Sequence, residues 1–390
     1  MKHCKKLLAG LIAFALLCGM GIPAGAKETK LQYGSDGAFR ILVFTDTHQQ
    51  KEDQPVTYTF MDEAIVFTQP DLVVLNGDIV VGSATENAET MRSAIKRISA
   101  PIVKHGVPFA LVYGNHDYEY KGKAGRKELM KMWQSIPGSL IRDDDPKNPG
   151  QSSYNLPVYG GKNSSKVISN LWFFDSGDYA EVGGYDWVRK EQIDWYVSAS
   201  QKLRRQNGGV PVPAVAFQHI IVPEIYDCFL KSPVATDSNV YKGIARLPIP
   251  DYRKMTGAML EPPCPPYYTD GQFDAWVEQG DIFAAVFGHD HVNDFIARID
   301  GIELRQVPDA GYGVAYGADA NRGATLITLT ESRPCGYDVQ PITYRQLAAR
   351  PESNIGNAHV SGEAWQWLLF GAEVWLQSII FAGQLARNIF

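Results

Sequence analysis

The stretch Arg40-Ile-Leu-Val-Phe-Thr-Asp-Thr-His48 shows the pattern from which the fold can be predicted. The apolar run Ile41–Phe44 predicts a buried strand, and Asp46 and His48 follow it within a few residues. Four further apolar runs are followed in the same way by polar segments: Gly77-Asp78, Gly114-Asn-His-Asp117, Gln218-His219 and Gly288-His-Asp-His291. Open α/β sheets gather their ligands at the carboxyl ends of strands, so these five segments are expected to meet in one place.

The hydrophobic pattern changes along the chain. Early strands alternate with amphipathic helices, whereas the late part shows hairpin-like strands. Expected strands are 41–44, 72–75, 109–112, 171–174, 214–217, 283–287, 295–299, 304–307 and 325–329. Expected helices are 57–68, one with its apolar face at 91–98 that ends at Pro101, 192–203 and 273–279. The pattern predicts an α/β (α+β) protein in which helices flank a sandwich of two sheets.

The polar segments are rich in metal-ligand types. Five of the seven histidines beyond residue 26 fall within them. Taken singly, each segment is also compatible with an ordinary turn or helix cap, but five in this order favour a metal site. Imidazole with carboxylate and amide oxygen suits Fe, Mn or Zn, and the absence of cysteine argues against a structural zinc site. Asp78 lies between two His-containing halves, which suggests a bridged pair of ions.

These motifs resemble those of the calcineurin-like metallophosphoesterase superfamily. The resemblance rests on Phe44-Thr-Asp-Thr-His48, Asn76-Gly-Asp78, Gly114-Asn-His-Asp117, His219 and Gly288-His-Asp-His291, and it spans about residues 38–330. The stretches Asp175-Ser-Gly-Asp-Tyr179 and Gly288–Asp294 resemble those of a bacterial, fungal and plant group that is often classified with the purple acid phosphatases. The resemblance implies a four-layer αββα sandwich with metals between the sheets' carboxyl edges.

The resemblance also implies a role for each motif residue. Asp46, His48, Asp78 and His291 would hold a first metal ion, and Asp78, Asn115, His219 and His289 a second. A hydroxide bridging the two ions would attack phosphorus in line. His116, oriented by Asp117, would act as general acid toward the leaving group.

One position departs from the purple enzymes. Those enzymes replace the histidine at position 48 and carry a tyrosine ligand three residues after the bridging aspartate. Here His48 is present and the tyrosine position is Val81, so the ligand set is calcineurin-like. The expected function is therefore hydrolysis of phosphate esters. The alternatives are a phosphodiesterase or nucleotide-directed hydrolase, or a catalytically silent metal-binding protein.

The first 26 residues have the three parts of a secretory signal. Basic Lys2, Lys5 and Lys6 precede the apolar run Leu7–Leu17, and Ala24-Gly-Ala26 supplies a small-residue cleavage site. A retained membrane anchor is the alternative, although the apolar run is shorter than the ~20 residues that span a bilayer. We expect cleavage after Ala26 and export to a secreted, periplasmic or cell-surface location.

Removal of this segment leaves 34 basic against 43 acidic residues, a net charge of −9. That balance disfavours a large nucleic-acid surface, for which clustered Lys and Arg are typical. The expected partner is a small phosphate ester or a phosphorylated substrate. Residues 27–350 are expected to form the phosphoesterase domain, and 351–390 a C-terminal tail.

Substrate contacts are expected from loops. Asp309–Gly317 is glycine-rich and carries Tyr312 and Tyr316, which either line the site or belong to an ordinary turn. Glu224, just past His219, is a weaker candidate. Two stretches, 142–161 and 232–266, look irregular and are candidates for shaping a cleft.

The tail contains an apolar helical segment, 364–386. Its few polar residues, Gln366, Glu373, Gln377 and Gln384, form one narrow stripe. The segment is expected either to dock on the protein's own surface or to contact a membrane. A chain ending near Ser353 is expected to remain active, because the motifs lie far upstream.

Overall fold

The computed structural model describes residues 29–119, 125–144, 147, 152–163, 165–233, 240–242, 244–312, 316–317 and 320–356. The expected signal segment 1–26 and the expected helix 364–386 lie outside the described residues. Within the described part of the chain, no helix is both long and apolar enough to cross a bilayer.

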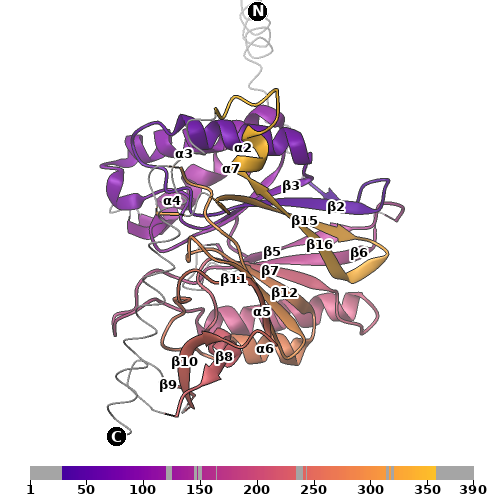
Figure 1. Cartoon of the computed structure of the whole chain (residues 1–390). Helices are drawn as coiled ribbons and strands as arrows, with labels where there is room; N and C mark the ends of the chain where they lie inside the picture. The colour runs from indigo at the N-terminus through magenta and orange to yellow at the C-terminus, as the bar shows by residue number, and fades with distance from the viewer. Residues whose placement is uncertain are drawn as a thin grey trace, which may run out of the picture. The chain divides into compact units, whose positions relative to one another are not determined.

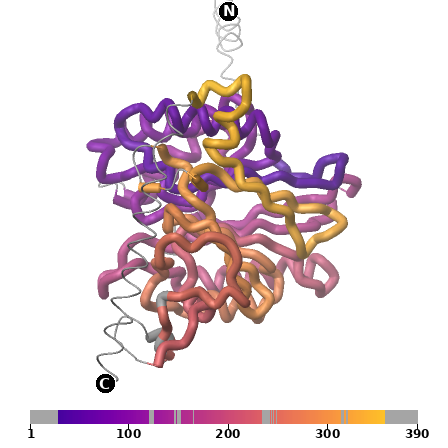
Figure 2. Tube along the Cα trace, in the orientation of Figure 1, coloured from indigo at the N-terminus to yellow at the C-terminus, as the bar shows by residue number. Residues whose placement is uncertain are grey.

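A five-stranded sheet forms from both ends of the described chain. Its order is β16 (Arg333–Thr343), β15 (Gly323–Thr330), β2 (Ala38–Phe44), β3 (Leu72–Asn76) and β4 (Phe109–Val112). Strands β2, β3 and β4 are parallel, whereas β15 pairs antiparallel with both β2 and β16. Late strand β15 thus lies beside early strand β2, as the tube trace shows (Figure 2).

An eight-stranded mixed sheet forms the second layer of strands. Its order is β1 (Leu31–Gln32), β5 (Tyr154–Tyr159), β6 (Val167–Phe174), β7 (Ala214–Gln218), β12 (Ile282–Phe287), β14 (Ile302–Gln306), β13 (Asp294–Ile299) and β11 (Met255–Ala258). Strands β6, β7, β12 and β14 run parallel in its centre. A small three-stranded sheet consists of β8 (Phe229–Lys231), β10 (Ile244–Pro250) and β9 (Val240–Tyr241).

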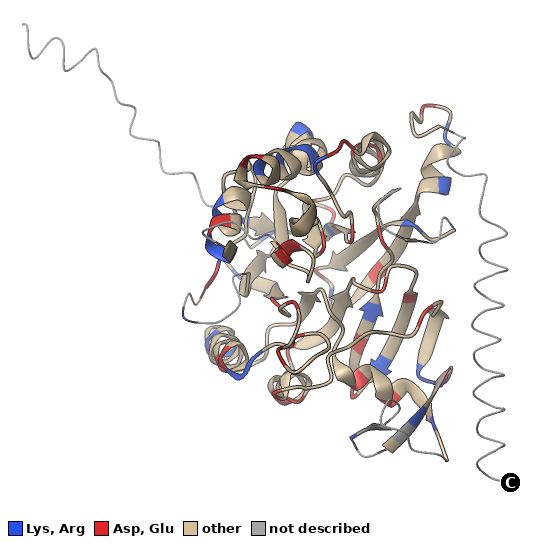
Figure 3. Ribbon diagram, turned by 90° about the vertical axis from the view of Figure 1, so that its left-hand side faces the viewer, with Lys and Arg blue, Asp and Glu red and all other residues tan. Residues whose placement is uncertain are grey.

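Helices cover the outer faces of the two large sheets (Figure 1). Helices α2 (Pro55–Thr68), α3 (Ala88–His105), α4 (Gly125–Gln134) and α7 (Tyr344–Ala348) lie on the side of the five-stranded sheet. Helices α5 (Lys190–Gln206) and α6 (Gln272–Gln279) lie on the side of the eight-stranded sheet. The expected sandwich of two mixed sheets between helical layers is confirmed. Lys and Arg are scattered over these helices and several strands in Figure 3 rather than gathered in one band.

Strand β6 shows how the layers are held together. Successive side chains of a strand point to opposite faces of its sheet. Leu171 and Phe173 therefore enter the core between the two sheets, whereas Trp172 and Phe174 pack in a second core beneath α5 and α6. A strand that is buried on both faces has a continuous apolar sequence, and for this reason such strands could be predicted from the sequence.

Helix α3 differs from its expected end at Pro101. It continues through Pro101 to His105 and ends at Gly106, whose φ of 65° is left-handed. The proline removes one backbone hydrogen bond. Burial of Ile98 and Ile102 in the core on either side of it keeps the helix intact. Tertiary packing here outweighs the tendency of Pro101 to end a helix.

The two stretches expected to be irregular contain strands. Strand β5 lies within 142–161, and β9, β10 and β11 lie within 232–266. Their prolines and glycines masked the strand pattern. The cysteines of the described chain, Cys228, Cys264 and Cys335, are free thiols.

The packed chain extends past residue 350, where we expected the domain to end. Ser353 Oγ and the Asn354 amide donate hydrogen bonds to the Glu63 carboxylate on α2, at 2.7 and 2.6 Å. Ile355 is only 3% exposed and joins the main core. A chain ending near Ser353 would therefore lose a core side chain.

Candidate metal centre

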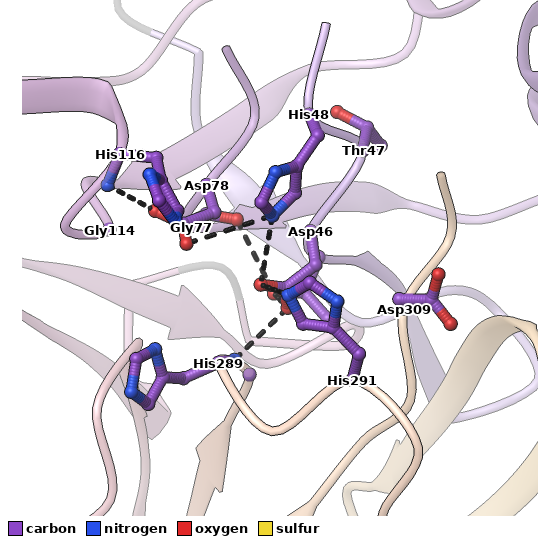
Figure 4. Close-up of polar contacts among 12 residues, drawn as sticks. Asp46, Thr47, His48, Gly77, Asp78, Gly114, His116, His289, His291 and Asp309 are labelled. Carbon is purple, nitrogen blue, oxygen red and sulfur yellow. Dashed lines mark hydrogen bonds and ion pairs between the residues drawn. The ribbon is translucent and has the colours of Figure 1, made fainter. Parts of the chain in front are cut away.

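The five polar segments meet where the carboxyl ends of β2, β3, β4, β7 and β12 face one another across the two sheets. Figure 4 labels residues of the segments that follow β2, β3, β4 and β12. Backbone hydrogen bonds join the first two segments, from the Asp46 amide to the Gly77 carbonyl and from the His48 amide to the Asp78 carbonyl, both 3.0 Å. The pairing of parallel strands β2, β3 and β4 brings the first three segments to one edge of their sheet, and the last two segments come from strands of the other sheet.

The first group of candidate ligands is Asp46, His48 and His291, all buried. Asp46 Oδ1 lies 3.4 Å from His291 Nε2 and 3.8 Å from His48 Nε2. Figure 4 shows the side chains of Asp46, His48 and His291 pointing toward one another.

The second group is Asp78, His219 and His289, also buried. Asp78 Oδ2 lies 3.1 Å from His219 Nε2 and 3.8 Å from His48 Nε2. Asp78 therefore faces ligands of both groups. A third set, His48, Asp78 and His116, overlaps the other two.

Five side-chain atoms in this centre are buried and form no hydrogen bond: Asp46 Oδ1, His48 Nε2, Asp78 Oδ2, Asn115 Oδ1 and His219 Nε2. Leaving a buried polar atom without a hydrogen bond costs about 1–3 kcal/mol. All five are atoms of the kind that ligate metals, and coordination would satisfy them. The residues fit a metal centre.

Hydrogen bonds anchor the opposite side of several candidate ligands. His219 Nδ1 lies 3.0 Å from the Asn76 carbonyl, and His291 Nδ1 lies 2.9 Å from the Tyr316 carbonyl. Because a carbonyl only accepts, both rings carry a hydrogen on Nδ1 and direct Nε2 toward the centre. Asn115 Nδ2 donates to Tyr179 Oη at 3.1 Å, which turns Asn115 Oδ1 toward the centre.

The carboxylates are anchored in the same way. Asp46 Oδ2 accepts hydrogen bonds from Thr45 Oγ1 at 2.6 Å and from the His289 amide at 3.0 Å. Asp78 Oδ1 accepts from the His116 amide at 2.8 Å. Each carboxylate thus has one oxygen fixed by the protein and one directed at the other ligands.

The glycines of the motifs permit this close approach. A Cβ on Gly77, which also has a φ of 92°, would lie 2.3 Å from His219 Nδ1. A Cβ on Gly114 would lie 2.2 Å from Asp78 Oδ1. Neither ligand could keep its place beside a larger residue.

The ligand residues have unusual backbone angles. Asp46, His48, Asp78 and His289 all have positive φ, between 49° and 77°. Such conformations cost about 1–3 kcal/mol each and collect at functional sites. The surrounding hydrogen bonds hold this strain in place.

The buried carboxylates Asp46 and Asp78 make the centre favourable for positive charge. Desolvation would raise the pKa of Asp46, but the nearby His219 and His291 outweigh it and hold the pKa well below the usual value. Desolvation would lower the pKa of His219, but Asp78 and Asp46 together raise it to about 10. Burial lowers the pKa of His289 to about 3, which keeps this ring neutral and able to ligate.

His116 has a different partner from the one expected. Its Nδ1 lies 2.8 Å from Glu119 Oε1, whereas Asp117 accepts hydrogen bonds from the backbone amides of Val80 and Gly114, at 2.9 and 2.8 Å. The orienting contact that we expected from Asp117 is therefore made by Glu119. Asp117 is fully buried beneath the loop, where desolvation and the charge of Asp78 raise its pKa to about 7. Its two hydrogen bonds connect the loop after β4 to the loop after β3.

The three candidate substrate residues lie in different places. The Tyr316 ring stacks on His291, with centroids 4.2 Å apart, and its hydroxyl donates to Glu261 at 3.0 Å. Tyr312 instead packs against Tyr344 on the core of the first sheet, with its centroid 5.5 Å away. Glu224 is buried in a 3-10 helix (Pro223–Cys228), with Lys242 Nζ 3.2 Å from its carboxylate. Of the three, Tyr316 is the one in contact with a candidate ligand.

Sequence reasoning missed Glu119, Tyr179 and Tyr185. Glu119 lies three residues after His116 in a short 3-10 helix (Asp117–Glu119), a spacing that would have signalled a contact. Tyr179 belongs to the quoted stretch Asp175–Tyr179 but received no role. The Tyr185 ring lies edge-on to His289 at 4.3 Å, across a turn that has no sequence signature for such contact.

A solved structure shares this fold. A dimetal phosphatase from Danio rerio superposes with a TM-score of 0.50 at 11% identity, over 75% of this chain and 93% of that one.

Sequence comparison gives the family. The model of the calcineurin-like phosphoesterase family matches residues 39–293. "Probable inactive purple acid phosphatase 14" of Arabidopsis thaliana is 31% identical over 319 residues, which is 73% of each chain. "Probable inactive purple acid phosphatase 29" of the same plant is 29% identical over 343 residues, 80% of this chain and 81% of that protein. This chain belongs to the calcineurin-like phosphoesterase family.

Proposed function

We propose that this protein is an exported, binuclear-metal phosphoesterase that hydrolyses phosphate esters, with His116 as general acid. The observation that carries the proposal is the convergence of five buried ligand atoms without hydrogen bonds, four of which belong to residues whose other polar side-chain atom is hydrogen-bonded. Ordinary packing does not gather such atoms, because each would cost free energy there.

The candidate ligands divide into two half-sites. Asp46, His48, Asp78 and His291 would hold one ion, and Asp78, Asn115, His219 and His289 the other. Bound ions of Fe, Mn or Zn would lower the pKa of water and neutralise charge on the phosphoryl oxygens. The protein's own contribution is to hold the ligands anchored before substrate arrives.

His116 is placed for proton transfer. Its side chain is partly exposed at the edge of the centre, and its ring lies 5.1 Å from that of His48. Because Nδ1 faces Glu119, Nε2 is the nitrogen available to protonate the oxygen that leaves phosphorus.

The names of the two Arabidopsis relatives favour a second candidate, a catalytically silent metal-binding protein. Against this, His48 and every other expected ligand are present and buried, and His116 lies beside His48 and Asp78. Val81 stands where the purple enzymes have a tyrosine ligand, so a coloured iron–tyrosinate centre is not expected.

The test is metal analysis of the purified protein followed by turnover of aryl phosphate monoesters and diesters. About two ions per chain with turnover that is lost on chelation and restored by one of Fe, Mn or Zn supports the proposal. Bound metal without turnover of any ester would show that the protein is a catalytically silent metal-binding protein. A strong preference for diesters would show that it is a phosphodiesterase or a nucleotide-directed hydrolase.

Location and partners complete the proposal. The N-terminal segment 1–26 favours export, and segment 364–386 remains a candidate membrane contact. The scattered Lys and Arg of the described residues favour a small phosphate ester or phosphorylated substrate over nucleic acid (Figure 3).

A further inference from the structure

A two-tyrosine hairpin stands beside the metal centre. Residues Asp178–Asp186, named here the tyrosine hairpin, form a tight turn in which Tyr179 and Tyr185 pair as an isolated antiparallel bridge. Backbone hydrogen bonds from Ala180 to Gly184, at 3.0 Å, and from Asp186 to Asp178, at 3.1 Å, close it.

Both tyrosines touch candidate ligands of one half-site. Tyr179 Oη accepts the 3.1 Å hydrogen bond from Asn115, and the Tyr185 ring lies edge-on to His289 with centroids 4.3 Å apart. The two tyrosine rings stack on each other at 5.8 Å and 29°. The tyrosine hairpin is therefore in direct contact with the second half-site.

The hairpin leaves aromatic surface open to solvent. Tyr179 is 49% exposed although its hydroxyl is bound. Tyr267 lies across Gly184, where an added Cβ would come within 2.7 Å of its ring, and is itself 77% exposed. Aromatic rings exposed beside a polar site are typical of ligand contacts.

The hairpin is held rigidly at both ends. Asp178 pairs with Arg126 at 3.3 Å, and the Arg126 guanidinium lies 3.7 Å from the Tyr118 ring centroid. Asp186 pairs with Arg189, whose guanidinium lies 3.6 Å from the Trp187 ring centroid. A rigid platform loses little entropy on binding. Both arginines already face a carboxylate, so the platform suits an uncharged group.

We propose that the tyrosine hairpin binds a neutral, planar aromatic group of the substrate. The preferred substrates are then phosphate esters whose alcohol part carries an aromatic ring, with the phosphoryl group at the metals and the ring stacked on Tyr179. This inference rests on the proposed function and deepens it by naming the substrate class. Stacking on a fixed ring is tolerant of the ring's identity, so the hairpin selects a class rather than one compound.

The test measures binding rather than turnover, with the full-length, metal-loaded protein. Titration calorimetry compares benzylphosphonate with ethylphosphonate, which share the phosphonate but differ in the ring. The wild type is expected to bind the benzyl compound at least 10-fold more tightly, about 1.4 kcal/mol. Tyr179→Leu should reduce that ratio to about 2 or less, in line with the size of one aromatic stacking contact.

Two control variants test whether the Tyr179 ring itself causes the preference for the benzyl compound. Tyr179→Phe removes the hydrogen bond to Asn115 but keeps the ring, so its benzyl-to-ethyl ratio should match the wild type even if both affinities fall. Tyr252→Leu changes a tyrosine that is 70% exposed on the turn after β10 and should leave the ratio unchanged.

The outcomes separate the two proposals. A wild type without benzyl preference, or a Tyr179→Leu protein that keeps it, overturns the role of the hairpin while leaving the phosphoesterase intact. Failure of the wild type to bind either phosphonate, together with no turnover of any ester, overturns the proposed function itself.

Discussion

His116 and Glu119 form a pair in which the imidazole Nδ1 lies 2.8 Å from the carboxylate Oε1. Ser83 Oγ donates to the other oxygen of Glu119, so the carboxylate is itself held from behind. This chain of contacts fixes the tautomer and direction of the ring at the edge of the metal centre.

The first prediction concerns His116. His116→Ala should retain its metals but lose roughly 10²–10⁴-fold in rate, the usual size of a lost general acid. The loss should be smaller for nitrophenyl esters, whose leaving group needs less protonation. Rates measured across esters of graded leaving-group pKa check this, and an equal loss for all of them would assign His116 to positioning.

The second prediction concerns Glu119. Glu119→Ala should lower kcat about 10-fold, because outer-shell partners of functional histidines contribute on that scale. In the His116→Ala background the same change should have little further effect. Glu86→Gln, an exposed carboxylate paired with Lys51, is the matched control. Additive losses in the double variant would show that Glu119 acts independently of His116.

The third prediction concerns Asp78, which faces both half-sites. Asp78→Asn should lower both metal content and turnover, because the amide removes the negative charge that two cations would share. Metal analysis by mass spectrometry alongside ester turnover checks this. Two retained ions with a normal rate would remove Asp78 from the bridging position.

The fourth prediction concerns the C-terminal tail. A chain ending at Gly356 should remain folded and active and become more soluble, because it keeps Ile355 in the core and removes the apolar segment 364–386. A chain ending at Ser353 should be less stable by about 2–4 kcal/mol, the cost of a lost core side chain. Thermal unfolding of the two chains is the measurement. Unfolding of the Gly356 chain would show that the tail completes the fold.

The fifth prediction concerns Asp281, a buried carboxylate that accepts from Tyr196, Ser200 and Trp172. Desolvation outweighs these bonds and raises its pKa. The folded state then holds the proton to higher pH than the unfolded chain, whose pKa is about 3.9. Its contribution to stability is present in full below that value and is lost as pH rises through the folded pKa.

Asp281→Asn cannot titrate and lacks this dependence. The wild type should therefore lose stability relative to the variant as pH rises from about 4. Urea unfolding of both proteins at a series of pH values measures the difference. A difference that stays constant with pH would contradict the raised pKa.

The strands that carry the centre, and the ligand types at their ends, could be predicted from the amino-acid sequence. Apolar runs such as Ile41–Phe44 and Leu72–Leu75 are buried on both faces, so their composition alone reveals them. Parallel strands then bring Asp46 and Asp78 to one edge, whatever the details of packing. The sandwich of two sheets flanked by helices followed from the order of expected strands and helices, and the seven candidate ligands followed from the resemblance of the five motifs to a known family.

The side chains that surround those ligands became known only from the folded structure. Glu119 rather than Asp117 reaches His116, because the short 3-10 helix turns Asp117 inward to the amides of Val80 and Gly114. Tyr185 reaches His289 across more than a hundred residues of sequence. Helix α3 continues through Pro101 because its core face stays buried. The contact of Tyr185 with His289 and the course of helix α3 depend on packing between residues far apart in the sequence, which no local residue pattern encodes.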